Sequence, residues 1–85
     1  MEPYRVLVCI EILRLEKPSR RDRDLILGFL EALARDPYAK GDYEEQDEVG
    51  RTVQIRVMGH YALTYWADHA VREVKVMKIE LADRI

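Results

Sequence analysis

The chain has 85 residues, of which 48% are hydrophobic and 35% are charged, and its formal net charge is −2. This composition predicts one globular domain over residues 1–85, because disordered chains carry fewer apolar residues. The single cysteine, Cys9, excludes an internal disulfide, and its apolar surroundings favour inert packing over a nucleophile. No apolar run approaches the roughly 20 residues of a membrane span, and the first residues lack the pattern of a signal peptide. We therefore expect a cytoplasmic protein with no membrane contact.

The charges are unevenly distributed along the chain. Residues 42–48, DYEEQDE, hold five acids and no base, whereas the remaining residues hold 14 bases against 11 acids. The body of the domain is therefore mildly basic. It lacks the strongly basic stripe that is expected of a free-standing nucleic-acid-binding protein.

The first half of the chain predicts a strand and a long helix. Residues 4–10 are apolar at both odd and even positions, which predicts a strand buried on both faces. Residues 11–17 fit either a continuation of this strand or a short helix that ends before a proline, and we favour the short helix.

Residues 19–35 predict the main helix. Ser19 is a good N-cap with Asp22 three residues later, and Asp36 and a proline end the pattern. Apolar residues recur at helical spacing, namely Ile26, Phe29, Leu30 and Leu33. The cluster Arg20, Arg21 and Arg23 fits either a solvated first turn or a docking site for an acidic partner or phosphate.

The second half of the chain predicts antiparallel strands. Residues 36–42 form a loop, and the acidic residues 43–47 suit an edge strand, because charge discourages pairing with other chains. Residues 50–66 alternate apolar and polar side chains on both sides of a turn at Gly59, which is typical of a hairpin. Residues 71–81 form the last strand, with a change of phase that suggests a bulge near Val76.

These elements predict an α+β domain. We expect a small antiparallel sheet of four to five strands, with the main helix, and the short helix before it where it forms, packed on one face. The expected helix-facing side chains of the hairpin are Val53, Ile55 and Val57. Arg56 and Gln54 then project from the opposite, open face, together with Thr52 and Trp66.

No sequence motif for a metal, a nucleotide or a nucleophile is present, so no cofactor or metal is expected. Asp68 and His69 are neighbours whose side chains point to opposite faces of a strand, and they do not converge on one ion. His60 fits either an exposed turn residue or a catalytic group. Tyr61 and Tyr65 are expected in the core, whereas Trp66 faces the other way and is the better candidate for a partner surface.

The order of these elements resembles the RelE/ParE family of bacterial toxins, which includes plasmid stabilisation proteins. The likeness covers roughly residues 4–84 and centres on the helix ending in LARDP, the hairpin VQIRVMGHYALTYW and the last strand VREVKVMKIELADR. Family helices close in L-x-x-x-P, and a Y-R-I-R-x-G-x-Y-R-x-x-Y hairpin follows. The resemblance implies a RelE/ParE-like fold.

The resemblance also implies the toxin component of a bacterial type II toxin–antitoxin module, neutralised by a protein antitoxin that wraps it with a helix or strand. RelE-like members are endoribonucleases that cleave messenger RNA on the ribosome, and ParE-like members poison DNA gyrase. A toxin-like scaffold that only binds protein, without activity, is a further alternative. The implied partners are an antitoxin, the ribosome with messenger RNA or DNA gyrase, and a second copy of the chain in a homodimer.

Carried over by position, the family's basic residues match only in part. Arg56 matches a basic hairpin position, and Arg84 corresponds to the basic residue after the last strand, so these two are the candidate catalytic residues. Ala62 stands where the family has an arginine. This departure fits a ParE-like target, a degenerate toxin or a divergent branch. The expected substrate- or partner-facing residues are Gln54, His60, Trp66 and Lys78.

Overall fold

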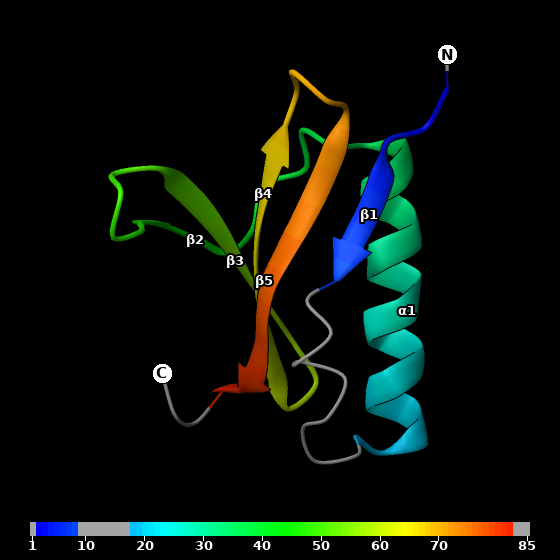
Figure 1. Cartoon of the computed structure of the whole chain (residues 1–85). Coiled ribbons are helices and arrows are strands. Elements are labelled where there is room, and N and C mark those ends of the chain that lie inside the picture. The colour runs from blue at the N-terminus through cyan, green and yellow to red at the C-terminus, as the bar shows by residue number, and fades with distance from the viewer. Residues whose placement is uncertain (1, 9–17, 83–85) are drawn as a thin grey trace.

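The computed structural model describes residues 2–8 and 18–82. In this part of the chain, one helix lies against a five-stranded sheet (Figure 1). The elements in chain order are β1 (Arg5–Val8), α1 (Arg20–Arg35), β2 (Tyr43–Gln46), β3 (Thr52–Met58), β4 (Tyr61–Asp68) and β5 (Glu73–Leu81). The strands lie in the order β1-β5-β4-β3-β2. The α+β class is confirmed, but the sheet is mixed, because β1 runs parallel to β5 while the other neighbours are antiparallel.

The first strand lies at an edge of the sheet, so the prediction that it is buried on both faces was wrong. Val6 and Val8 pack on the core below the helix, whereas Leu7 points to the other face and is 44% exposed. A run that is apolar at every position therefore does not prove two covered faces. The expected end of this strand at residues 9 and 10, the expected short helix at 11–17 and the candidate Arg84 lie outside the described residues.

Helix α1 forms as its sequence predicts. The backbone N–H of Asp22 donates to Ser19 Oγ over 3.1 Å, so Ser19 is the N-cap. At the other end the N–H of Asp36 donates to the carbonyl of Ala32, and a proline follows. The apolar stripe of the helix packs on the side chains of β4 and β5 that face it. These are Tyr61, Leu63, Tyr65, Val74 and Val76, all at most 7% exposed.

The predicted bulge in the last strand is confirmed. Thr64 pairs with Lys78 and the next residue, Tyr65, pairs with Val76, so Met77 is the extra residue of β5. Val74 and Val76, which precede the bulge, face α1. Because the bulge adds one residue, Ile79, which follows it, faces α1 as well. This change of phase keeps the helix-facing side of β5 apolar along its length.

Strand β3 is turned the opposite way from the prediction. Arg56 pairs with Leu63, and Gln54 pairs with Tyr65, so these two polar side chains lie on the face that α1 covers. Val53 and Ile55 lie on the other face, yet each is only 3% exposed. The expectation that they pack against α1 was therefore wrong. Alternation defines two faces of a strand, but it does not say which of them meets the helix.

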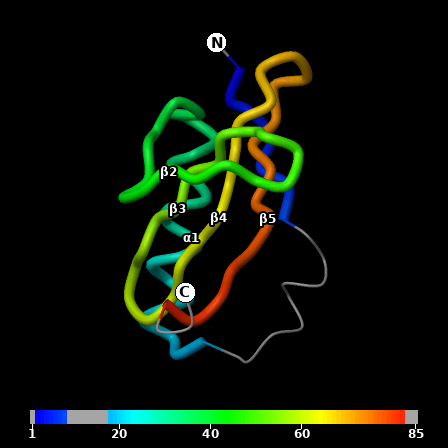
Figure 2. Tube along the Cα trace, turned by 90° about the vertical axis from the view of Figure 1, so that its left-hand side faces the viewer, coloured from blue at the N-terminus to red at the C-terminus, as the bar shows by residue number. Residues whose placement is uncertain are grey.

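The end of the sheet formed by β2 and β3 curls away from α1. Figure 1 shows this hairpin projecting from the sheet on the side remote from the helix, and Figure 2 shows its loop in front of β4 and β5. All four residues of β2 are exposed, as predicted for an acidic edge strand. The curl encloses Val53 and Ile55, because the loop after β2 lines the same hollow as these two side chains.

Candidate functional site

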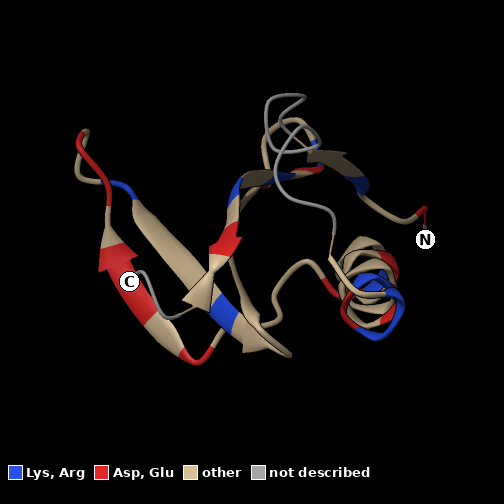
Figure 3. Ribbon diagram, turned by 90° about the horizontal axis from the view of Figure 1, so that it is seen from below, with Lys and Arg blue, Asp and Glu red and all other residues tan. Residues whose placement is uncertain are grey.

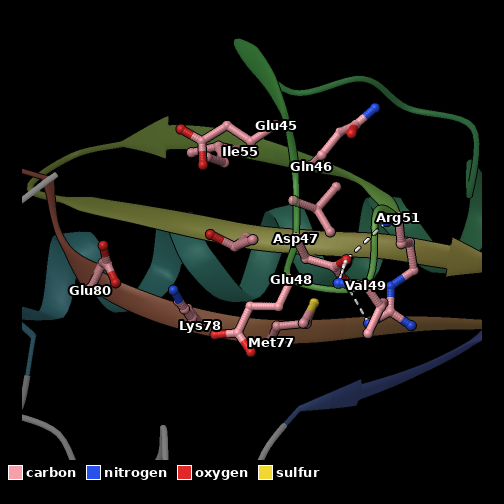
Figure 4. A pocket seen from close by; sticks show the side chains of 12 residues that line it. Glu45, Gln46, Asp47, Glu48, Val49, Arg51, Ile55, Met77, Lys78 and Glu80 are labelled. Atoms are coloured by element: carbon pink, nitrogen blue, oxygen red, sulfur yellow. Dashed lines mark hydrogen bonds and ion pairs between the residues drawn. The ribbon is translucent and has the colours of Figure 1, made fainter.

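The face of the sheet opposite α1, called the open face below, carries a hollow of about 510 Å³. Its floor comes from β3, β4 and the bulge of β5, with Val53, Ile55 and Met77 as apolar side chains and Thr64 as a polar one (Figure 4). Its remaining walls come from β2, from the loop that follows it, and from the second half of β5. These residues are Glu45, Gln46, Asp47, Glu48, Val49, Arg51, Lys78 and Glu80.

Trp66 lies beside this hollow between two cations, Arg51 just before β3 and Lys75 on β5. The guanidinium of Arg51 is 4.1 Å from the centre of the indole ring, and the ammonium of Lys75 is 5.0 Å from it. Both distances are within the range of a cation–π contact. The single tryptophan of the chain is therefore fixed on the open face, as its position in the hairpin predicted.

Each of these two cations also binds an aspartate. Arg51 Nε donates to Asp47 Oδ2 over 2.8 Å, and Lys75 Nζ lies 3.0 Å from Asp68 Oδ2. Burial raises the pKa of Asp47, but hydrogen bonds from the backbone and side chain of Arg51 and from the backbone of Val49 outweigh it and leave this pKa lowered. The hydrogen bond from Lys75 lowers the pKa of Asp68. The charges around Trp66 are thus neutralised in pairs.

The other charged side chains around the hollow are mainly negative. Glu45, Glu48 and Glu80 come from β2, its loop and β5, and Figure 4 shows them around the hollow with Lys78. None of these four side chains belongs to an ion pair formed within the described residues. The open face therefore combines a largely apolar floor with a tryptophan that contacts two cations. The charged side chains of the rim that form no ion pair within the described residues are three carboxylates and one ammonium.

Arg56, the candidate catalytic residue of the hairpin, does not lie on this face. Its guanidinium is 5.6 Å from the ring centre of Phe29 on α1, and its Nη1 lies 3.9 Å from Asp42 Oδ1. Gln54 is on the same side, where its Oε1 accepts from the N–H of Gly41 and its Nε2 donates to Glu44. Both residues therefore support the loop before β2. Of the expected partner-facing residues, Lys78 and Trp66 share the open face.

His60 lies at the β3–β4 turn and is attached to the start of the helix. Its Nδ1 donates to Oδ2 of Asp22 over 2.8 Å, and Asp22 is only 4% exposed although the imidazole is largely in solvent. The hydrogen bond from His60 is the largest influence on the pKa of Asp22 and lowers it. Burial raises this pKa by less, and the hydrogen bond with Ser19 lowers it further. The expected partner-facing role of His60 thus stands beside an observed structural one.

Replacing Asp22 with asparagine tests this contact. Because the pKa of Asp22 is lowered on folding, its charge stabilises the fold above its unfolded value of about 3.9 and this contribution is lost as the pH falls through the lower folded value. We expect Asp22→Asn to lower the melting temperature at neutral pH and to flatten its decline in acid. Thermal unfolding followed by circular dichroism across this range measures both. Asp24→Asn, an exposed carboxyl on the same turn, is the control, and equal effects of the two changes would contradict the contact.

The carboxylates of the rim were not among the residues selected from the sequence. For Glu45 and Glu48 the signal was the acidic run 42–48, of which residues 43–47 were predicted as an edge strand, and the structure has β2 over Tyr43–Gln46. Nothing in the run itself tells that the hairpin curls and brings Glu45 and Glu48 to the same hollow as Glu80. Arg51 was missed for the same reason. It precedes β3, and its contact with Trp66 of β4 depends on how the two strands pack in the sheet.

Among the described residues, no cluster of histidine, cysteine and acidic side chains is placed to hold a metal ion. In the same part of the chain, no helix has the length and apolar character needed to cross a membrane. The open face thus brings together apolar, aromatic and charged side chains.

No protein-family model matches the chain, and no curated protein matches it. Among solved structures, one chain of the toxin–antitoxin complex RelBE2 from Mycobacterium tuberculosis is similar, with a TM-score of 0.73 and 23% sequence identity. The alignment covers 93% of this chain and 98% of the other. The single helix beside a five-stranded sheet, seen in the described residues, is therefore the fold of a protein found in a toxin–antitoxin complex, as the resemblance implied.

Proposed function

We propose that this chain is the toxin component of a toxin–antitoxin module and is neutralised by a protein antitoxin. The observation that carries the proposal is the shared fold, which extends over nearly the whole of both aligned chains. The chain that it resembles is found in a toxin–antitoxin complex, and the sequence pattern of helix, hairpin and last strand resembles that of the RelE/ParE toxins. The proposed location is the cytoplasm of a bacterium.

The open face has the properties of a protein-binding surface. Val49, which lines the hollow, is 78% exposed, and Leu7, which lies on β1 near Trp66 and Lys75 of the same face, is 44% exposed. Contiguous apolar surface rimmed by polar residues marks interaction sites, and tryptophan and arginine are enriched among the residues that carry binding energy. Trp66 with Arg51 gives this face such a pair.

Cleavage of messenger RNA is the less favoured activity of the proposed toxin. Such cleavage needs a group that takes the 2′-hydroxyl proton and cations that hold the phosphate. On the open face the described cations Arg51 and Lys75 are paired with aspartates, and Lys78 lines a hollow that also holds the carboxylates of Glu45, Glu48 and Glu80. Arg56 lies on the helix side. This charge pattern repels a phosphate backbone, and it favours a ParE-like target, such as gyrase, or a purely protein-binding role.

Expression in a bacterial host tests the proposal. We expect growth to stop when the chain is induced alone and to resume when the small open reading frame next to its gene is expressed with it. A gene copy with an early stop codon controls for toxicity of the transcript. Mapping of messenger-RNA ends and of plasmid supercoiling after induction separates nuclease from gyrase poisoning. Unchanged growth, together with no complex between the chain and the neighbouring product, would rule the toxin role out.

A further inference from the structure

We propose that the hollow on the open face binds a basic, amphipathic segment of the protein partner. An apolar side chain of the segment enters the hollow, and lysine or arginine side chains beside it bind Glu45, Glu48 and Glu80. The identity of the partner as an antitoxin rests on the proposed function, whereas the chemistry of the segment follows from the hollow itself.

The floor sets the apolar half of this requirement. Val53 and Ile55 are each 3% exposed, so they form the packed base of the hollow, and the apolar surface that a partner can reach comes from Met77 and from Val49, which is 78% exposed. Met77, the extra residue of the β5 bulge, lines the same hollow with a flexible thioether. A preformed apolar wall beside an adaptable methionine suits a leucine- or isoleucine-sized side chain.

The rim sets the charged half. Figure 4 shows Glu45 on the β3 side of the hollow and Glu48 over β5, the strand that carries Glu80, so a bound segment meets carboxylates from separate elements. Among the described cations near the rim, Lys78 can offset one of these carboxylates, whereas Arg51 is bound to Asp47 and Lys75 to Asp68, so the rim stays negative. Complementary potentials steer association and suppress wrong partners. The hollow therefore selects cationic segments and disfavours nucleic acid.

A second copy of this chain is the main rival occupant. The first turn of α1 carries Arg20, Arg21 and Arg23, seen as the blue end of the helix in Figure 3, and Leu27 on the same helix is 50% exposed. Insertion of this end into the hollow of another copy would be head-to-tail contact, which leads to open filaments unless the geometry closes. A segment of a separate partner neutralises the carboxylates of the rim without leading to filaments, so we favour such a partner as the occupant.

Short labelled peptides test the proposal on the full chain. The probes are a peptide in which leucine and lysine alternate, its leucine–glutamate counterpart, and a single-stranded RNA. We expect only the lysine peptide to bind, measured by fluorescence anisotropy, with amide shifts of isotope-labelled protein confined to β2, its loop and β5. Glu48→Lys with Glu80→Lys should weaken this binding at least about tenfold. Asp24→Lys with Glu31→Lys makes the same change of net charge at exposed sites on α1 and should leave it within about twofold.

Other outcomes would overturn the proposal. They are equal loss in both double variants, preference for the glutamate peptide or the RNA, shifts that centre on α1, or self-association of the chain that the Glu48 and Glu80 changes abolish. Circular dichroism confirms that each variant is folded before it is compared. Because none of these measurements involves growth, a failed peptide experiment and a failed growth-arrest experiment are distinguishable.

Discussion

Leu33→Ala is expected to destabilise the domain by about 2–5 kcal/mol, because it empties space in a closed core. Leu33 is 0% exposed and lies in one cluster with Tyr65, Val74 and Val76, which join the helix to the two strands beneath it. Small domains are stable by only about 5–15 kcal/mol in total, so this change removes a large share. For a domain of this size, each kcal/mol corresponds to about 4–8 °C in melting temperature.

Leu27→Ala is the matched control, since Leu27 lies on the same helix but is 50% exposed. It should change the free energy of unfolding by no more than about 0.5 kcal/mol. Urea unfolding of both variants, with midpoint and slope compared, measures the difference. Similar midpoints for the two variants would mean that the buried face of α1 is not the one described.

The sequence predicted the elements of this fold better than their faces. Ser19 and the apolar spacing of α1 are local signals, and the structure confirms both because capping and amphipathicity act within one helix. The orientation of β3 depends on what covers each face. Arg56 can face the helix because the ring of Phe29 accepts its guanidinium and Asp42 lies near it, and neither contact is visible in the alternation of the strand.

The candidate site shows the same limit at longer range. Trp66 was correctly expected on the open face, because the period of two within one strand determines it once Tyr65 is buried. The hollow beside it requires the curl of the β2–β3 hairpin and the bulge at Met77, which bring separate segments together. Such an arrangement follows from tertiary packing, so the acidic run could be placed on an edge but not at a binding surface.

Gly41→Ala is expected to cost about 2–4 kcal/mol, since it combines overpacking with lost hydrogen bonds. A Cβ atom at Gly41 would collide with the backbone carbonyl of Ile55 in β3, and backbone cannot move aside as the end of a side chain can. The same segment donates from Gly41 N–H to Gln54 and from Asp42 N–H to Ile55, and Asp42 accepts from the N–H of Val57. Displacing the loop would weaken these bonds together.

Gly28→Ala is the matched control for this prediction, because the same methyl group at the middle of α1 meets nothing within 4 Å. Alanine is favoured over glycine in a helix interior by about 0.8–1.0 kcal/mol, so this variant should be more stable than the parent chain. The two substitutions are chemically identical, and their opposite signs isolate the close approach of the loop to β3. Urea midpoints of the two variants measure the signs, and a Gly41→Ala midpoint at or above that of the parent would show that this loop does not pack on β3 as described.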